Sequence, residues 1–162
     1  MTKKRFSNTI KFNDEQRRAF ETVKEMLCDY TKLYAPDYTK PFIIRTDSSD
    51  YAVGCSLSQV DGANIERPIA FASQKLSESQ RKMSTIEKES YGVIFALRRF
   101  EPYVFLSKIQ IFSDHCPLSY IVSNASVSPK LARWALSLSK YDLTIKHLSG
   151  SENKVADALS RC

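Results

Sequence analysis

Three segments of the chain carry apolar residues at helical spacing behind a helix-start signal. Asn13 with Gln16, and Ser84 with Glu87, have capping-box spacing. Ser128-Pro129 places a cap residue before a proline in the first turn. The pattern therefore predicts three helices whose buried faces carry Phe20, Val23, Leu27 and Tyr30, then Ile86, Val93, Ile94, Leu97 and Phe100, then Leu131, Trp134, Leu138 and Tyr141.

Short runs rich in β-branched and aromatic residues predict strands between these helices. The runs cover residues 42–46, 51–59, 68–73, 108–113 and 143–148. Asp61-Gly62 is a hairpin signal between the second and third runs, so the first three strands are expected to form an antiparallel meander. Pro102 is expected to end the second helix, and further helices are expected near residues 117–122 and 153–161. This order predicts an α/β fold with a mixed sheet.

The length and composition are those of one globular domain. The chain has 162 residues, of which 43% are hydrophobic and 26% charged. The net charge of +6 and the pI near 9.1 favour a polyanionic partner. Four scattered cysteines without a C-x-x-C pair indicate reduced thiols, and zinc-ligand spacing is absent. The sequence has no recognisable signal peptide or membrane span, so we expect an intracellular protein, cytoplasmic or nuclear.

Four acidic residues border apolar runs, where a carboxylate is costly unless a positive charge compensates it. They are Asp47, Glu89, Asp114 and Asp157. Two of them follow predicted strands, at the edge where α/β sheets gather ligands, and helices can bring the other two there. Hard oxygen ligands suit Mg²⁺ or Mn²⁺, and a pair of such ions can promote phosphodiester cleavage. Taken singly, such an acid is more often a turn residue or a helix cap, and Asp50 and Glu87 compete for the same assignment.

Five motifs follow one another along nearly the whole chain, from Phe12 to Arg161. They are residues 40–54 (KPFIIRTDSSDYAVG), 68–76 (PIAFASQKL), 84–89 (STIEKE), 113–118 (SDHCPL) and 153–161 (NKVADALSR). In this order and spacing the chain resembles the RNase H domain that follows the polymerase in gypsy-type LTR retrotransposon polyproteins. The resemblance implies an α/β, RNase H-like fold: a five-stranded mixed sheet flanked by helices, with an N-terminal leader helix. It also implies metal-dependent endonucleolytic cleavage of the RNA strand in an RNA–DNA hybrid.

The resemblance also implies which acids bind the metal ions. The family's catalytic and metal-binding acids fall on Asp47, Glu89, Asp114 and Asp157. This choice favours Glu89 over Glu87 and Asp47 over Asp50. The implied cofactor is a pair of Mg²⁺ or Mn²⁺ ions bound at one site.

Other residues receive weaker assignments. His147 lies ten residues before Asp157, where cellular RNases H carry a mobile histidine that assists proton transfer or product release. Packing or solvent exposure is the plainer interpretation of His147. Gly92 stands where relatives usually have alanine and is expected to weaken its helix by about 1 kcal/mol. Candidate phosphate contacts are Arg45, Lys75, Arg81, Lys82, Lys88, Arg98, Arg99 and Arg133.

The resemblance divides the chain into a leader and a catalytic domain. Residues 1–40 are expected to be a remnant of the polymerase-to-RNase H connection, and residues 41–162 the RNase H-like domain. The chain contains no Asp-Asp pair, so we expect no polymerase site, and the chain looks like a fragment or derived copy of a longer polyprotein with an upstream polymerase. Two alternatives stay open. One is an inactive nucleic-acid-binding or scaffold domain, and the other is an integrase or transposase core, against which residues 113–118 and 156–161 argue.

Overall fold

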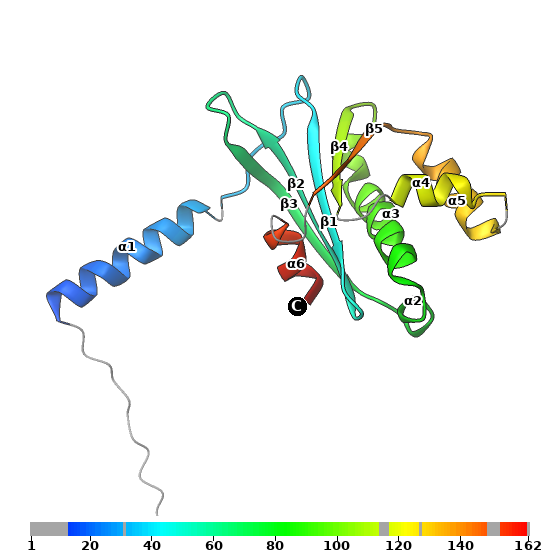
Figure 1. The fold of residues 1–162 in the computed structure, drawn as a ribbon. Coiled ribbons are helices and arrows are strands. Elements are labelled where there is room, and N and C mark those ends of the chain that lie inside the picture. The colour runs from blue at the N-terminus through cyan, green and yellow to red at the C-terminus, as the bar shows by residue number, and fades with distance from the viewer. Residues whose placement is uncertain (1–12, 31, 114–116, 127, 149–152, 162) are drawn as a thin grey trace, which may run out of the picture. The chain divides into compact units, whose positions relative to one another are not determined.

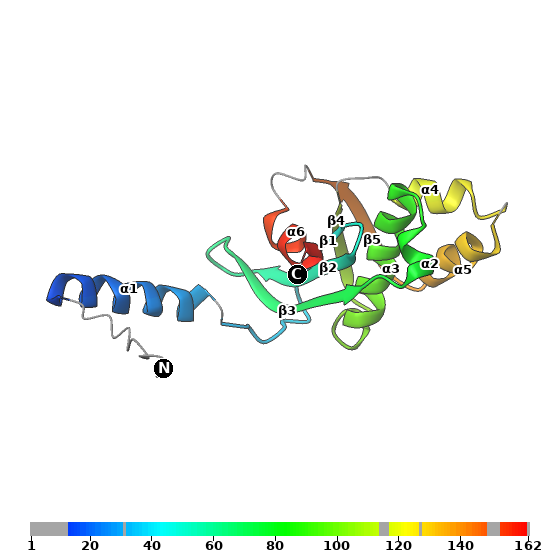
Figure 2. The ribbon, with the colours of Figure 1, turned by 90° about the horizontal axis from the view of Figure 1, so that it is seen from below.

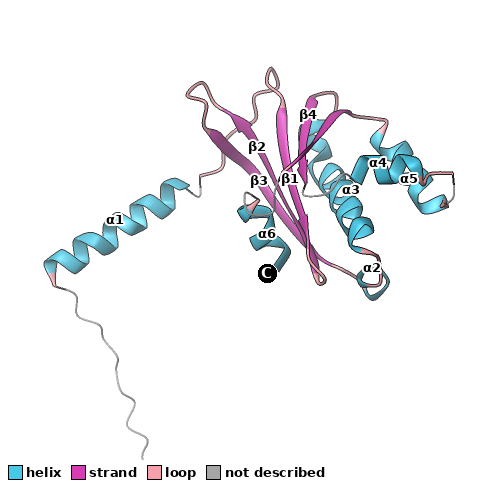
Figure 3. Cartoon of the chain, viewed as in Figure 1, coloured by secondary structure: helices cyan, strands magenta, loops and turns pink. Residues whose placement is uncertain are grey.

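A computed structural model describes residues 13–30, 32–113, 117–126, 128–148 and 153–161 of the chain. The chain forms two compact units, Met1–Lys32 and Leu33–Cys162. The larger unit contains a five-stranded sheet flanked by helices (Figures 1 and 3).

Helix α1 (Asp14–Tyr30) occupies most of the described part of the smaller unit. It begins with the predicted capping box, because the N–H of Gln16 donates to Asn13 Oδ1 at 2.8 Å and the N–H of Asn13 donates to Gln16 Oε1 at 3.1 Å. Phe20 and Val23 of the predicted apolar stripe are 48% and 54% exposed. Within the described residues, no helix has the length and apolar character needed to cross a lipid bilayer.

The sheet has the mixed topology that the sequence predicts. Its strands are β1 (Phe42–Ser48), β2 (Ala52–Val60), β3 (Glu66–Lys75), β4 (Lys108–Ser113) and β5 (Asp142–His147), in the order β3-β2-β1-β4-β5. The first three strands form the expected antiparallel meander. Strand β4 runs parallel to β1, and β5 runs parallel to β4. Strand β1 is therefore central, and its carboxyl end lies at the same edge as those of β4 and β5.

Helices cover the two faces of the sheet unequally. Helix α3 (Thr85–Val104) packs on β1, β2 and β4, and α4 (Pro117–Ser123) and α5 (Pro129–Leu138) pack on α3. Helix α6 (Lys154–Arg161) packs on β1, β2 and β3 from the opposite face (Figure 2). The short α2 (Glu78–Arg81), which the sequence pattern does not predict, connects β3 to α3.

The hydrophobic core lies between the sheet and α3. Every second residue of the strands points into this core, and one face of α3 packs against them. The strand and helix periodicities of the sequence thus select residues of the same cluster. Its fully buried members include Phe42, Ile44, Leu57, Val93, Ile94, Leu97, Phe100, Ile109 and Ile111. Cys55 belongs to the same cluster, and burial raises the pKa of its thiol to about 12. This thiol is therefore unreactive, as expected for a reduced core cysteine.

The segment that leads into β1 is hydrogen-bonded to the sheet. The side-chain amide of Gln59 donates to the main-chain oxygens of Asp37 and Lys40 at 2.8 and 3.1 Å, and its oxygen accepts from the N–H of Asp37 at 2.9 Å. The N–H of Tyr34 donates to the oxygen of Pro68 at 2.8 Å. Residues 33–40 thus belong to the compact unit of the sheet, and the functional boundary at residue 40 stays a prediction.

One prediction about a helix end is wrong. Helix α3 does not end at Pro102 but continues to Val104, because Phe100 and Val104 on either side of the proline are buried in the core. Tertiary packing here outweighs the loss of one helical hydrogen bond. Ser128 is the N-cap of α5 with Pro129 in the first turn, as predicted, although its side chain makes no capping hydrogen bond within the described residues. Both capping boxes predicted for α1 and α3 are confirmed.

Gly54→Ala is expected to destabilise the protein by about 1–3 kcal/mol, because added bulk in a packed contact forces the backbone to move. A Cβ at this position would lie 2.5 Å from the main-chain oxygen of Ala156 and 2.5 Å from the nitrogen of Ser160. Urea denaturation measures the change. Gly62→Ala is the control, since a Cβ there meets nothing within 4 Å. Equal stability of the two variants would contradict a close α6–β2 contact.

Candidate active site

The carboxyl end of β1 lies between two helices on opposite faces of the sheet. Asp47 pairs with Gly54 of β2, and a Cβ on Gly54 would point into α6. Because side chains alternate along a strand, Thr46 and Ser48 face the other way, towards α3. A Cβ on Gly92 of α3 would lie 2.8 Å from Ser48 Oγ. Strand β1 therefore directs Asp47 towards α6 and its two neighbours towards α3.

Helix α6 is fastened to β1 at both of its ends. Before its first turn, Asn153 Nδ2 donates to the main-chain oxygen of Thr46 at 2.8 Å. In its last turn, Ser160 Oγ lies 2.5 Å from Asp47 Oδ2, and Ser49 Oγ donates to the main-chain oxygen of Ser160 at 2.6 Å. These bonds hold the helix against the end of the strand.

Asp157 is carried to this edge by α6. Ser160 Oγ, which contacts the Asp47 carboxylate, also lies 2.9 Å from the main-chain oxygen of Asp157. The side chain of Asp157 is 38% exposed and pairs with Arg161, whose Nε and Nη2 lie 2.7 and 2.5 Å from Oδ1. Ser160 thus links the Asp47 carboxylate to the main chain of the helical turn that carries Asp157.

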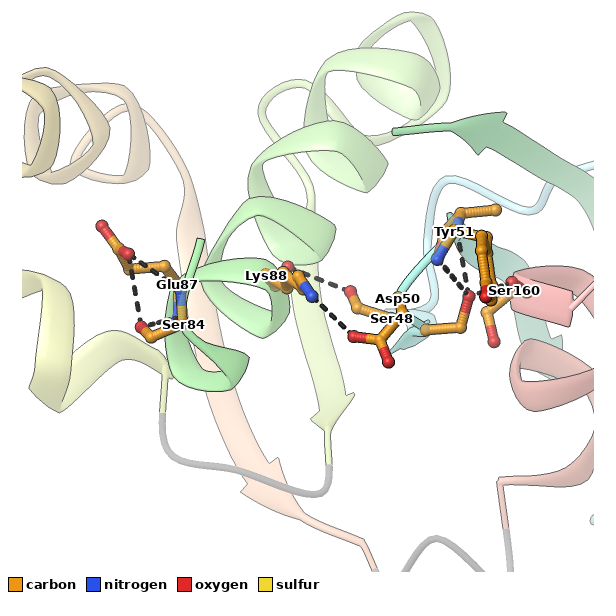
Figure 4. Close-up of polar contacts among 9 residues, drawn as sticks. Ser48, Asp50, Tyr51, Ser84, Glu87, Lys88 and Ser160 are labelled. Atoms are coloured by element: carbon orange, nitrogen blue, oxygen red, sulfur yellow. Dashed lines mark hydrogen bonds and ion pairs between the residues drawn. The ribbon is translucent and has the colours of Figure 1, made fainter. Parts of the chain in front are cut away.

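Glu89 reaches the same edge from the other face. Ser48 Oγ donates to the main-chain oxygen of Lys88 at 3.0 Å, so this turn of α3 lies against the end of β1 (Figure 4). Glu89 itself is 2% exposed. Gly92 leaves room for the hydroxyl of Ser48, which a Cβ at that position would meet at 2.8 Å, a role that helix propensity alone does not reveal.

Asp50 and Glu87, the two acids that compete for the metal-ligand assignment, each pair with a lysine. Lys88 Nζ lies 2.6 Å from Asp50 Oδ1, and this hydrogen bond and charge hold the pKa of Asp50 below its ordinary value of 3.8. Glu87 accepts from the N–H of Ser84 in the predicted capping box and pairs with Lys130 at 2.5 Å. Lys130 is the main cause that lowers the pKa of Glu87. Figure 4 shows Lys88 reaching across to Asp50 and Glu87 folded back onto Ser84.

The structure bears differently on the two other predicted site residues, Asp114 and His147. Asp114 lies outside the described residues, together with His115 and Cys116. The residue before it, Ser113, ends β4 and pairs with His147 at the end of β5. His147 is exposed, so the structure places it at the same sheet edge with its side chain open to solvent.

Several buried polar atoms at this edge have no hydrogen-bond partner among the described residues. They are Thr46 Oγ1, Ser113 Oγ and Asn153 Oδ1. A buried polar atom is costly unless water or an ion satisfies it. The environment is therefore suited to bound water and to a cation that carries part of its hydration shell.

The donor set at this edge fits a hard divalent cation. Asp47, Glu89 and Asp157 offer carboxylate oxygens and no sulfur or imidazole, which matches the preference of Mg²⁺ and Mn²⁺. Within the described ranges, which exclude Asp114, no group of three or more His, Cys, Asp or Glu residues is arranged to hold a metal ion. The fit therefore rests on the chemistry of the acids and on the elements that carry them.

The candidate phosphate contacts do not form one cluster. Lys88 and Arg81 lie next to the turn after β1, with Arg81 stacked 5.5 Å from the ring centre of Tyr51. Arg45 is held elsewhere, by a bidentate pair with Glu66 at 2.9 and 2.7 Å. Other members of the set, among them Lys75, Lys82, Arg98 and Arg99, are exposed.

Ser160 and Asn153 are the site residues that the sequence analysis missed. Both lie inside the 153–161 motif, but serine and asparagine are common helix-end residues and draw little notice. A helical signal was available for Ser160, because it lies one turn after Asp157 and so shares its side of α6. Nothing in the sequence pairs Ser160 with Asp47, 113 positions away.

The architecture defines the fold class. The structure is similar to a foamy viral protease–reverse transcriptase solved with double-stranded DNA, with a TM-score of 0.63, 18% identity, and coverage of 88% of this chain and 30% of that chain. It is also similar to RNase H1 from the archaeon Halobacterium salinarum, with a TM-score of 0.51, 19% identity, and coverage of 74% and 92%. The fold is RNase H-like.

The family follows from the sequence. Residues 37–141 match the family model of the RNase H-like domain found in reverse transcriptase, and the chain belongs to this family. It is 37% identical over 152 residues to the Pol polyprotein of transposon 412 and 35% identical over 153 residues to that of transposon opus. It is 34% identical over 154 residues to that of transposon gypsy. All three are from Drosophila melanogaster, and each match covers 94% of this chain. The chain spans only 12–15% of the length of these relatives.

Asp50→Asn is expected to destabilise the protein only where Asp50 is ionised. Because the folded state lowers the pKa of Asp50, its contribution is complete above the ordinary value of 3.8 and is lost as the pH falls through the lower folded value. The stability difference from wild type should therefore shrink below pH 3.8. Urea denaturation from neutral pH down to about pH 2.5 measures it.

The control for this test is the same substitution in a Lys88→Met background. Methionine fills the largely buried position of the lysine chain without its charge, so Asp50→Asn should then lose its pH-dependent effect. An unchanged pH dependence in that background would show that Lys88 is not the cause.

Proposed function

We propose that this chain is a metal-dependent ribonuclease H that cleaves the RNA strand of RNA–DNA hybrids. One observation carries the proposal. Three acids from β1, α3 and α6 lie at one edge of an RNase H-like sheet, while the neighbouring acids Asp50 and Glu87 are engaged by lysines. The Pol polyproteins that the chain resembles, and a foamy viral reverse transcriptase solved with an RNA/DNA hybrid, are consistent with this substrate.

Asp47, Glu89, Asp114 and Asp157 would hold the metal ions. When bound, a pair of Mg²⁺ or Mn²⁺ ions would activate the attacking water and stabilise the leaving oxygen. Asp47 is suited to bind metal because the pairing of β1 with β2, which continues to Ser48, holds it in place. Glu89 is 2% exposed, so its carboxylate is in a position where ionisation needs a compensating charge.

Basic side chains near this edge would orient the hybrid. Arg81 lies beside the turn that follows β1, where it can contact the phosphates of a bound hybrid. Lys88 is already paired with Asp50, so it contributes mainly by holding that turn to α3. Polymerase activity would belong to other parts of a longer polyprotein, since we expect no polymerase site in this chain.

Glu89→Gln and Asp114→Asn are each expected to lower hybrid cleavage by about 100-fold or more, because either change removes a charged metal ligand. The assay uses the full chain, a hybrid labelled on its RNA strand, and Mg²⁺ or Mn²⁺. Glu87→Gln is the matched control on the same helix, where glutamine can keep the capping box, and its rate should stay within a few-fold of wild type.

Hybrid binding is measured in parallel with cleavage. Binding without cleavage by the wild-type chain would favour the alternative function, an inactive nucleic-acid-binding or scaffold domain. Cleavage that Glu89→Gln does not reduce would show that the activity comes from elsewhere.

His147 is proposed to assist proton transfer or product release, as its exposed position at the shared edge permits. His147→Ala should then lower the cleavage rate and change its dependence on pH between about pH 5 and 8. Single-turnover cleavage across that range measures both. A rate and pH profile equal to those of wild type would leave His147 as a solvent-exposed strand residue.

A further inference from the structure

The last turn of α6 places two side chains on two different acids of the candidate site. Ser160 is fully buried, and its hydroxyl lies 2.5 Å from Asp47 Oδ2. Arg161 is 71% exposed, and its guanidinium lies against Asp157 Oδ1. One side chain is a neutral donor inside the protein, and the other is a cation at its surface.

The hydroxyl of Ser160 has one proton and two acceptors within reach. The carboxylate oxygen of Asp47 is at 2.5 Å, and the main-chain oxygen of Asp157 is at 2.9 Å. The shorter contact is to a charged acceptor, and hydrogen bonds to charged acceptors are the stronger ones. The proton of Ser160 is therefore donated to Asp47 and helps to orient its carboxylate.

The docking of α6 does not depend on this hydroxyl. Ser73 Oγ donates to the main-chain oxygen of Leu159 at 2.7 Å, and Ser49 Oγ donates to that of Ser160 at 2.6 Å. Asn153 holds the start of the helix to Thr46 at 2.8 Å. Loss of the Ser160 hydroxyl should thus leave the helix in place and remove only its hydrogen bond to the carboxylate of Asp47.

Arg161 has the opposite effect, because it makes Asp157 less available to a metal ion. Its pair with Asp157 is at the surface, where such pairs add little stability. The guanidinium nevertheless compensates a carboxylate that a divalent cation would need, so the two cations compete for Asp157. Metal binding at this acid must displace the guanidinium or work against its charge.

We propose that the last turn of α6 sets the divalent-cation affinity of the site through these two residues. Ser160 is a positioning residue that raises the affinity by orienting Asp47, and Arg161 lowers it by occupying Asp157. The inference rests on the proposed function, because it assumes that both acids bind metal. It assigns to α6 a second role beyond carrying a ligand.

The test is calorimetric titration of the full chain with Mn²⁺ and, separately, Mg²⁺, without nucleic acid. Ser160→Ala should weaken binding by about 10–100-fold, the usual effect of removing a group that orients a metal ligand. Arg161→Gln should strengthen binding, a change of opposite sign. Both variants are compared with wild type in urea denaturation without metal, to show that they are folded.

Ser73→Ala is the matched control. It removes a hydrogen bond of similar length that docks the same turn of α6, yet it touches neither acid. Its metal affinity should remain within about twofold of wild type, because it changes no group bonded to a ligand. Ser160→Thr, which keeps the hydroxyl, should restore much of the affinity that Ser160→Ala loses.

The outcomes separate this inference from the proposed function. If wild type binds metal and cleaves hybrid but Ser160→Ala binds as Ser73→Ala does, Ser160 only docks the helix and the inference is wrong. If Arg161→Gln binds no more tightly than wild type, competition at Asp157 is wrong. If wild type binds no divalent cation, the proposed function fails, and the inference fails with it.

Discussion

The close contact between α6 and β2 at Gly54 is the constraint on which the arrangement of this edge depends. A Cβ at this position would lie 2.5 Å from main-chain atoms of α6, so only glycine lets the helix rest directly on the strand. At that separation the short side chain of Ser160 reaches Asp47. A helix displaced outward by one side-chain layer would break this bond and carry Asp157 away from β1. The contact at Gly92 on the opposite face is less strict, because a Cβ there would meet the side-chain hydroxyl of Ser48 at 2.8 Å rather than main-chain atoms.

Charge compensation around the edge is uneven, and this unevenness distinguishes the acids. Asp50 and Glu87 have lysine partners that lower their pKa values, so each already performs a structural task. Glu89 is buried in a helix that is fixed against the sheet, and Asp157 is paired with an exposed arginine. The negative charges of Glu89, Asp157 and Asp47 at one edge of the sheet would stabilise an added cation there. The same setting includes buried hydroxyl and amide atoms that water can satisfy.

Local signals in the sequence were sufficient for most of the fold. Reciprocal caps at Asn13–Gln16 and Ser84–Glu87 and the alternation of the strands gave elements whose ends differ from the structure by a few residues. The failures occurred where distant packing decides. Pro102 remains within α3 because Phe100 and Val104 are buried around it. Single turns such as α2 carry too few residues for a periodic signal.

The sequence by itself determined the alternation of strands and helices, the family, and the acids that the family's motifs select, because these depend on local periodicity and on short patterns in order. Tertiary structure decided which side chains surround those acids. The contact of Ser160 with Asp47, the hold of Asn153 on Thr46 and the pairing of Lys88 with Asp50 each join residues at least 38 positions apart. Such contacts depend on strand register and on how closely a helix can approach a sheet. Those quantities are set by packing across the whole domain, and no local pattern encodes them.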